Sequence, residues 1–530
     1  MTHTLDGTVQ LLRLALRRDR RRLAIWVVAV VGLTYFSGSA MGSAFPTQRS
    51  IDSYGDSVSS SPALIAMTGP PLGLHTLAGI VINKVAVTAI IGVCLVAILT
   101  VVRHTRSEEE EGRSEMLRAT IVGRHAGSAA AMLLTSGLSV VMGGGTAVAL
   151  IGSQVPAGSA WLFGAGIAAL GIVFGAIALV AAQVFTHART ALGVSLAVVG
   201  LAYVVRAIGD VKENALVWLS PIGWAQATHV LGDERWWPLL VMLLATVVLL
   251  GVSVALADRR DVGAGLVAPR NGSATASAAL SGPVGLALRL QRGTLLGWGF
   301  GLFALAAAMG SLSNEIADMA KDNPTLEKYL QVSGPASLTD TFFSTMLSIM
   351  ALLACAFAVS SALRLRSEET SGRLEPLLAT GLSRTRWMLG SLVITVGGTL
   401  VLLCVTGFGM GLSYGLVIGD AGQPWRYAAL TLAYAPAVAV IAGLAVLLVG
   451  CAPRQVAVAW AALAFCFVLG WLGGLLDPPR WVNEISPFWH TPAVPVDDVT
   501  WGTLGVLTLV AAVLVALGVA GFRRRDIAAG

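Results

Sequence analysis

The residues with the most evident chemical potential form a charged string that occurs twice. Residues 106–120 read RSEEEEGRSEMLRAT and residues 366–380 read RSEETSGRLEPLLAT, a constant offset of 260 with 10 of 15 positions identical. Each copy lies between two long apolar segments. Because apolar segments change freely among hydrophobic residues, a charged string repeated between them indicates one interaction that is made twice.

The residue types in this string indicate a binding segment rather than a catalytic site. Each copy combines charged residues with leucines, and apolar anchors with a charged rim are typical of a protein–protein interface. Acidic residues favour a helix start, and the glycine of each copy permits a turn. The candidate docking residues are Glu108, Glu109, Glu110, Glu111, Gly112, Arg113 and Glu115, with Glu368, Glu369, Gly372, Arg373 and Glu375 in the second copy. A solvated helix face would explain one copy alone, whereas two equivalent copies favour a docked partner.

The two copies also differ from each other. Glu110-Glu111 of the first copy correspond to Thr370-Ser371 of the second, and Met116 corresponds to Pro376. A proline suits only the first turn of a helix that follows. The two docking sites are therefore expected to have unequal partners or unequal duties.

Sites for other chemistry are absent from the sequence. No lysine follows a glycine, so the chain has no phosphate-binding loop and no recognisable ATP site of its own. The five cysteines include no CxxC pair, which indicates neither a disulfide framework nor a metal site. No nucleophile–base cluster is evident. We therefore expect a chain that is not an enzyme and that holds no cofactor or metal.

The composition is that of a membrane protein. Of 530 residues, 55% are hydrophobic and 12% are charged, whereas a soluble chain has about a quarter charged residues. Apolar runs long enough to cross a bilayer as helices recur throughout. The sequence predicts an all-α polytopic protein with spans at 23–44, 77–102, 126–151, 160–185, 190–208, 237–257, 293–312, 341–363, 388–418, 427–450, 456–476 and 502–522.

The distribution of basic residues predicts the orientation of these spans. Most of the 35 lysines and arginines fall on the side that holds both termini, and the positive-inside rule makes that side cytoplasmic. Because the basic clusters adjoin span ends, topology explains them better than nucleic-acid binding does. We expect a multi-pass protein of a bacterial plasma membrane with both termini in the cytoplasm and lipid as its surroundings.

Three further short motifs that occur in both halves indicate that the chain consists of two parallel six-helix repeats. LALR occurs at 14–17 and 286–289, a Gly-Pro pair at 69–70 and 334–335, and a Ser-Pro pair at 220–221 and 486–487. An even number of spans per half makes both halves enter the membrane in the same direction. The predicted parts are a first half (1–257), a cytoplasmic linker (258–283) and a second half (284–530). The basic, leucine-rich segments before the first span of each half are either helices in the interface or charged span flanks.

Charged groups within the spans are few. No Asp or Glu lies in the middle of a predicted span, although ion-coupled carriers usually need such a group. Lys84 and Arg206 lie toward the outer ends of their spans, where each either extends to the interface or provides a counter-charge for an anionic substrate. A chain without a coupling carboxylate or an ATP site either depends on a partner protein for energy or does not transport a substrate against its concentration gradient.

The motif E-E-x-x-G-R-x-E after the second and eighth spans, with the Ser-Pro-aromatic elements, resembles the fused permeases of type V (ABC-2-like) bacterial ABC exporters. Among them the chain is similar to actinobacterial exporters of polyketide antibiotics such as tetronasin and to mycobacterial multidrug members. The resemblance covers nearly the whole chain. It implies export of hydrophobic or amphipathic compounds, powered by two copies of a separately encoded ATPase that binds ATP and Mg²⁺.

The resemblance also implies roles for particular segments. The strings 106–120 and 366–380 would be the coupling segments that enter grooves of the ATPase. The second and fifth helices of each half (77–102, 190–208, 341–363 and 456–476) would line the pathway. Candidate pathway residues on the eighth span are Phe342, Met346, Ile349, Met350, Leu353 and Phe357, for which ordinary helix packing is the alternative. Outer loops around Pro70, Pro221, Pro335 and Pro487 would form a gate.

Two other functions compete with the exporter. A secondary multidrug carrier could also have two six-helix halves, and the missing membrane acids argue against it. A non-transporting membrane scaffold could dock an ATPase without substrate-stimulated hydrolysis. The substrate and the direction of transport are not specified by the sequence.

Overall fold

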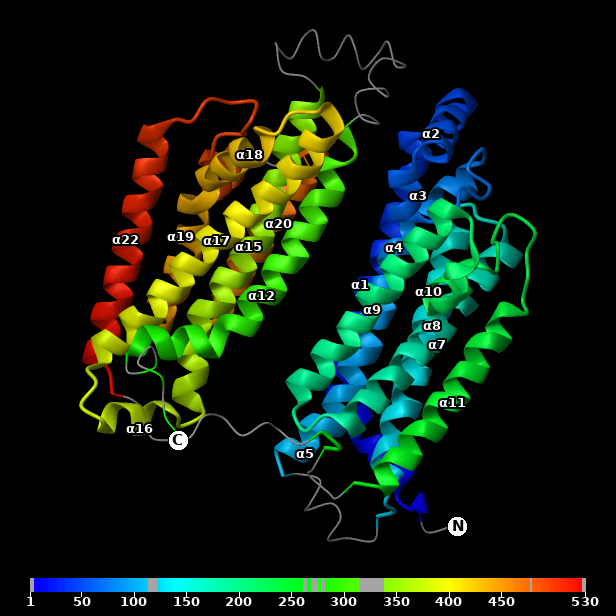
Figure 1. Cartoon of the computed structure of the whole chain (residues 1–530), viewed down its shortest axis with the longest axis horizontal. Coiled ribbons are helices and arrows are strands. Elements are labelled where there is room, and N and C mark those ends of the chain that lie inside the picture. The colour runs from blue at the N-terminus through cyan, green and yellow to red at the C-terminus, as the bar shows by residue number, and fades with distance from the viewer. Residues whose placement is uncertain are drawn as a thin grey trace. The chain divides into compact units, whose positions relative to one another are not determined.

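The computed structural model describes residues 4–112, 122–260, 265–267, 275, 277, 280, 282–313, 338–476 and 479–526. Within these ranges the regular elements are helices, and a single bridge joins Phe185 to Val267. The chain divides into two compact units, Met1–Gly272 and Ser273–Gly530. Each unit is a bundle of long helices that run roughly alongside one another (Figure 1).

The first unit has six long helices, and shorter ones lie between them. The long helices are α1 (Thr8–Ala44), α4 (Leu77–Val102), α7 (Ala126–Gly152), α8 (Ala157–Val184), α9 (Ala188–Lys212) and α11 (Pro238–Asp258). The shorter elements are α2 (Gln48–Ser60), α3 (Pro62–Thr68), the π-helical turn η2 (Arg103–Ser107), α5 (Glu108–Glu110), η3 (Ala215–Leu219) and α10 (Pro221–Gln226). The segments 45–76 and 209–236, predicted as outer loops, thus contain short helices.

The second unit repeats this pattern with one interruption. Its long helices are α12 (Pro283–Gly310), α15 (Leu338–Thr370), α17 (Arg384–Ile418), α19 (Ala435–Cys451), α20 (Ala457–Leu476) and α22 (Trp501–Arg524). Shorter elements are α16 (Leu374–Ala379), α18 (Gln423–Thr431), η5 (Leu432–Tyr434), α21 (Arg480–Glu484) and η6 (Pro487–His490). The single span predicted at 427–450 is therefore a run of α18, η5 and α19, with Pro436 in the first turn of α19.

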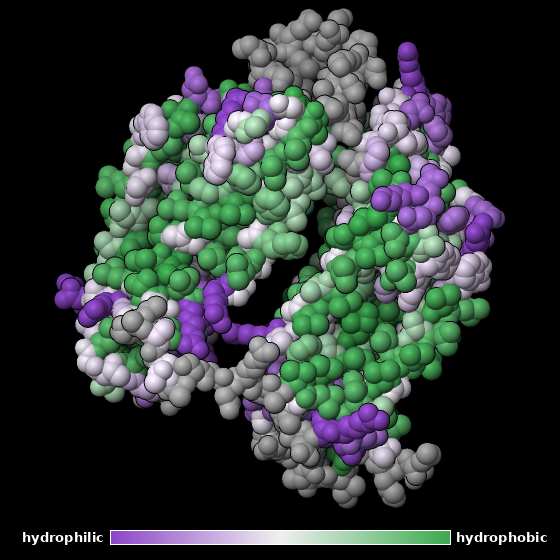
Figure 2. All heavy atoms as spheres, in the orientation of Figure 1, coloured by the Kyte–Doolittle hydropathy of each residue, from purple (hydrophilic) through white to green (hydrophobic). Residues whose placement is uncertain are grey.

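The predicted fold class is confirmed. In the described part of the chain, 11 helices are long and apolar enough to cross a membrane. The apolar helix α20 lies at the position of the remaining predicted span. Hydrophobic residues cover the middle of each unit, and hydrophilic residues gather toward the helix ends (Figure 2). An apolar surface of this extent is stable only against lipid.

The second span of each unit is among its most buried helices, and α8 is buried to the same extent. In α4 and α15, 67% of the most apolar stretch is buried, compared with 17% in α1, α11 and α12. The first and sixth helices of the first unit, and the first helix of the second, therefore present most of their surface outward. Because the charged strings continue from α4 and α15, each string is joined directly to a helix that is largely buried within its unit.

Small residues allow the helices of each unit to approach closely. A Cβ added to Gly143 on α7 would lie 2.3 Å from the carbonyl oxygen of Gly164 on α8. In the second unit, a Cβ on Gly450 of α19 would lie 2.0 Å from the carbonyl oxygen of Gly518 on α22. Glycine at such crossings is typical of membrane helices, which gain from close van der Waals packing.

Candidate functional site

The charged strings lie at equivalent positions in the two units. In the first, α4 continues through the π-helical turn η2 into α5, which carries Glu108, Glu109 and Glu110. In the second, Glu368 and Glu369 lie in the last turns of α15. Gly112 (φ 71°) and Gly372 (φ 69°) then adopt the left-handed conformation that favours glycine. Arg113 and Glu115 lie outside the described residues, whereas Arg373 directly precedes α16, which contains Glu375.

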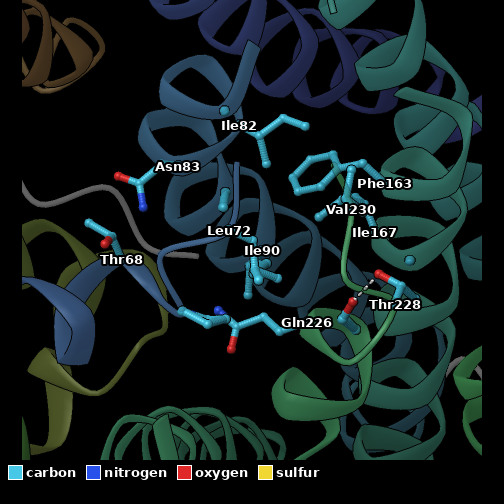
Figure 3. A pocket seen from close by; sticks show the side chains of 15 residues that line it. Thr68, Leu72, Ile82, Asn83, Ile90, Phe163, Ile167, Gln226, Thr228 and Val230 are labelled. Carbon is cyan, nitrogen blue, oxygen red and sulfur yellow. Dashed lines mark hydrogen bonds between the residues drawn. The ribbon is translucent and has the colours of Figure 1, made fainter. Parts of the chain in front are cut away.

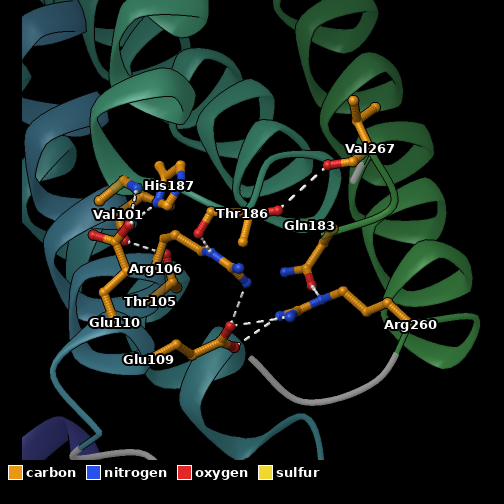
Figure 4. Close-up of polar contacts among 11 residues, drawn as sticks. Val101, Thr105, Arg106, Glu109, Glu110, Gln183, Thr186, His187, Arg260 and Val267 are labelled. Atoms are coloured by element: carbon orange, nitrogen blue, oxygen red, sulfur yellow. Dashed lines mark hydrogen bonds and ion pairs between the residues drawn. The ribbon is translucent and has the colours of Figure 1, made fainter. Parts of the chain in front are cut away.

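Glu109 is held between two arginines within the first unit (Figure 4). Arg106, one turn earlier, donates from Nη1 to Glu109 Oε2 at 2.6 Å. Arg260, which follows α11, donates to both carboxylate oxygens at 2.7 and 3.0 Å. The side chains of Arg106, Glu109 and Arg260 are 1%, 10% and 8% exposed. We call these three residues the first clamp.

Glu369 has the same arrangement in the second unit. Arg525, which follows α22, donates from Nη1 to Oε1 at 2.7 Å and from Nη2 to Oε2 at 2.6 Å. Arg366, one turn before Glu369, lies 3.0 Å from Oε2. The Glu369 side chain is 1% exposed. Arg366, Glu369 and Arg525 form the second clamp.

Each clamp joins the second helix of a unit to the residue that follows its sixth helix. Charge-assisted bonds from an arginine fork to both carboxylate oxygens fix distance and orientation together. Removing one partner of such a buried pair is costly because it leaves an uncompensated charge. The clamps therefore link the two helices of each unit.

The clamp arginines were missed from the sequence. Arg260 and Arg525 were counted only among the basic residues that set the orientation of the spans. A signal was present, because each half ends its sixth span with adjacent arginines, Arg259-Arg260 and Arg523-Arg524-Arg525. Their partners lie 151 and 156 residues earlier in the chain, so only the fold shows the pairing.

Neighbouring groups hold the first clamp in place. Arg106 also donates from Nε to the carbonyl oxygen of Thr186 at 2.6 Å, and Arg260 donates from Nε to Gln183 Oε1 at 2.7 Å. Both acceptors lie where α8 ends and the chain turns toward α9. Glu110 accepts a bond from the backbone N–H of Ala188, at the start of α9, at 3.0 Å. The first string is thus attached to α8, α9 and α11 at once.

The first glutamate of each string is also paired within its unit. Glu108 binds Arg18 of α1 and lies 3.6 Å from His104 Nδ1. Glu368 lies 3.3 Å from Arg364 Nε and accepts a bond from Arg373 Nε at 2.8 Å.

Several string residues that the structure describes are exposed to solvent. Glu111 in the first copy, and Arg373, Glu375 and Pro376 in the second, are exposed. Leu374 of α16 is buried in the core of the second unit, with Leu377 partly buried against it. The second string therefore contains a short helix, α16, whose Leu374 is fixed in the core of the unit while Glu375 faces solvent.

The candidate pathway residues on α15 lie mainly inside the second unit. Ile349, Met350 and Phe357 are buried, and Phe357 packs against Gly398 of α17. The other three, Phe342, Met346 and Leu353, are partly buried against the same core. Their contacts within the unit are those of helix packing.

The two cations within the spans have internal contacts. Lys84 Nζ lies 4.6 Å from the centre of the Tyr54 ring. Arg206, 1% exposed, pairs with Asp210 through Nη1 at 3.1 Å and lies over the Tyr203 ring. Because α9 extends to Lys212 rather than ending at the predicted 208, Asp210 lies in the helix. Arg206 is thus buried and does not extend to the interface.

The prolines predicted to form an outer gate occupy distinct positions. Pro221 begins α10, where Ser220 accepts bonds from Ile222 N and Gly223 N, and Pro487 begins η6. Pro335 lies outside the described residues. Pro70 lines a cavity of about 70 Å³ between α4, α8 and α10 (Figure 3).

This cavity is mostly apolar with a few polar groups. Its lining includes Leu72, Ile82, Ile90, Phe163, Ile167 and Val230, with Thr68, Asn83, Gln226 and Thr228 as polar members. Asn83 Oδ1 accepts a bond from Tyr54 at 2.8 Å. Burial raises the pKa of Tyr54 to about 12. The described residues contain no cluster of side chains that could hold a metal ion.

Comparisons with known proteins cover both units. A family model described as "Multidrug efflux system permease Rv1217c, C-terminal domain" matches residues 10–256 and 280–523. The chain is 39% identical over 524 residues to the multidrug efflux system permease protein Rv1217c of Mycobacterium tuberculosis (strain ATCC 25618 / H37Rv). This alignment covers 98% of the present chain and 95% of that relative. Both charged strings lie within the matched ranges.

Proposed function

The chain belongs to the Rv1217c family of multidrug efflux permeases, and on this premise we propose that it is the membrane subunit of an exporter driven by a separately encoded ATPase. Two ATPase copies, which bind ATP and Mg²⁺, dock on the two charged strings. The substrates are hydrophobic or amphipathic compounds. The observation that carries the proposal is the duplicated clamp. The same ion-pair linkage occurs at equivalent helix ends of both units, which suits a partner that binds as two copies.

The clamps give a route for force from the docked ATPase to the membrane helices. The turn that carries Glu109 or Glu369 is continuous with α4 or α15, one of the most buried helices of its unit. Through Arg260 or Arg525, the same turn is bonded to the end of α11 or α22. A displacement of the string therefore acts on the second and sixth spans together, and closure of the ATPase dimer would change the access of the pathway.

Docking and force transmission are assigned to different residues, which makes the proposal testable. We expect the charge reversals Glu111→Lys and Glu375→Lys together to reduce association with the ATPase about tenfold or more, because like charges across an interface cost several kcal/mol. The measurement is co-purification of the ATPase with the full-length, membrane-inserted permease. Glu213→Lys is the matched control, since Glu213 is equally exposed but follows α9 at its other end.

Undiminished co-purification of the doubly reversed variant would contradict docking at the strings. The strings would then be solvated helix ends. A membrane scaffold would have to bind the ATPase through another surface, whereas a secondary carrier would need no docking surface. Loss of the ATPase from the Glu213→Lys control as well would show a general effect of charge instead of a site.

One observation favours a second candidate, a proton-coupled carrier. Asp210 lies within α9, its side chain is 5% exposed, and its partner is Arg206. An ionisable residue within a membrane helix is a usual feature of proton pathways. The exporter and the carrier differ in their energy source, since only the carrier stops when the proton gradient collapses while ATP remains.

A further inference from the structure

The segments that precede the first span of each unit share a sequence and a position. Each contains LALR, at 14–17 in α1 and 286–289 in α12. Each is helical and continuous with the span that follows, because α1 begins at Thr8 and α12 at Pro283. These are amphipathic helical extensions of the spans, which we call the basic leaders (8–22 and 283–292).

One face of each basic leader is fixed to the second helix of its unit. Two residues after LALR, Asp19 is buried and accepts bonds from Arg103 Nε at 2.8 Å and Nη2 at 3.0 Å. Gln291, at the equivalent place in the second unit, is buried and accepts a bond from Ser361 Oγ at 2.7 Å. The leaders are therefore held at a defined angle rather than extending freely from the spans.

The opposite face of each leader is basic and apolar at once. Arg17 and Arg289 precede the inward residues by two positions, which places them on the other side of the helix. Apart from Arg18, which pairs with Glu108, the exposed arginines are Arg13, Arg17, Arg20 and Arg21 in the first leader and Arg289 and Arg292 in the second. Within the described part of the chain these six have no hydrogen-bond or ion-pair partner.

Large apolar side chains are exposed among these arginines. Leu14 and Leu16 are 52% and 44% exposed, and Leu288 and Leu290 are 45% and 46% exposed. A face that serves only to contact water would not combine unpaired arginines with exposed leucines. An anion dissolved in water would satisfy the arginines but would leave the leucines exposed. A lipid with a phosphate headgroup satisfies both, because the leucines then lie against acyl chains.

We propose that the two basic leaders bind the headgroups of anionic phospholipids, with one equivalent site in each unit. The planar guanidinium forks pair with the lipid phosphates, and the leucines insert below them. The site lies close to the charged string, since Asp19 bonds Arg103 and lies 3.0 Å from His104, both in the turn that leads to Glu108. Bound lipid therefore braces the turn from which the string extends. This binding does not depend on the ATPase.

The test uses the full-length permease in phosphatidylcholine vesicles that contain spin-labelled phosphatidylglycerol or spin-labelled phosphatidylcholine. The ratio of motionally restricted label gives the preference for the anionic lipid. We expect Arg17→Gln with Arg21→Gln, or Arg289→Gln with Arg292→Gln, to lower that preference by at least about fivefold, because a single arginine at a membrane surface already contributes that factor. Because the replaced side chains have no internal partner, thermal stability should not change.

The matched control is Arg523→Gln with Arg524→Gln, two exposed arginines at the end of α22 that have no leucine within a turn. It should retain the preference of the unmodified chain. An equal decrease in this control would overturn the proposal and leave a general attraction between basic residues and the bilayer. A preference unchanged in both leader variants would overturn it as well. Competition by inorganic phosphate beyond that of sodium chloride at equal ionic strength would show a site for a soluble anion instead of a lipid.

Discussion

The Arg525→Gln variant is expected to be less stable than the Glu369→Gln variant by about 2 kcal/mol, although both lose the same ion pair. The reason is the difference in burial. The Glu369 side chain is 1% exposed, whereas Arg525 is 18% and Arg366 is 26% exposed. Removing Arg525 leaves a buried carboxylate with one partner, while removing the carboxylate leaves arginines that can reach water.

Thermal unfolding of the purified permease in one detergent measures this difference. The double variant Glu369→Gln with Arg525→Gln is the control, because two neutral amides can bond to each other and should be less destabilised than the sum of the single changes. Equal stability of the two single variants, with additive effects in the double one, would show that the second clamp is a solvent-screened contact.

Substrate-stimulated ATP hydrolysis should fall about tenfold in the double clamp variant Glu109→Gln with Glu369→Gln, within the usual 1–3 kcal/mol range of coupling between sites. The clamps lie inward of the exposed string residues, so ATPase binding should persist. The sixth helices would then no longer follow the strings, because the fork bonds to Arg260 and Arg525 are weakened. Hydrolysis and co-purification are measured on the same preparation, and the Glu484→Gln variant, which alters a glutamate paired with the exposed Arg480, serves as the control.

Loss of the ATPase together with its stimulation would contradict this division of roles, because the clamp glutamates would then be part of the docking surface. Full stimulation in the double variant would show that α4 and α15 alone carry the force. Either result would be distinct from a folding failure, which the unfolding measurement detects.

The helices themselves were largely predictable because apolar length is a strong signal. Each predicted span has a helix at its position, with boundaries that differ by several residues at charged ends. The predicted first span, 23–44, begins in the structure at Thr8 because arginines and leucines continue the helical pattern. The break in 427–450 was missed, although Pro436 marks it in retrospect.

The short helices outside the spans were less predictable. Segment 48–68 lies between the first two predicted spans, where no helix was predicted, yet α2 and α3 form there. Thr47 and Ser61 cap them by accepting bonds from Ser50 N and Leu64 N. Tyr54 of α2 packs toward α4 through its bond to Asn83. Local capping signals were present in the sequence, but the tertiary contacts that stabilise such short helices were not.

The charged strings were predicted to be docking sites, while the ion pairs within each unit could not be predicted. Repetition indicated that Glu109 and Glu369 have equivalent roles. Whether a glutamate faces a partner or its own chain depends on which helix ends lie beside it, and Arg260 and Arg525 reach these positions only through the packing of the bundle. The docking role of residues beyond the second clamp, such as Glu375, stays a prediction.

The most direct test of an exporter driven by a separately encoded ATPase is a transport assay. It measures uptake of a hydrophobic fluorescent dye into inverted membrane vesicles that contain the permease and its ATPase. We predict that ATP-dependent uptake continues when a protonophore collapses the proton gradient and stops when the ATPase is omitted. Uptake by the permease alone, driven by a proton gradient and abolished by the protonophore while ATP is present, would contradict the account and establish a secondary carrier.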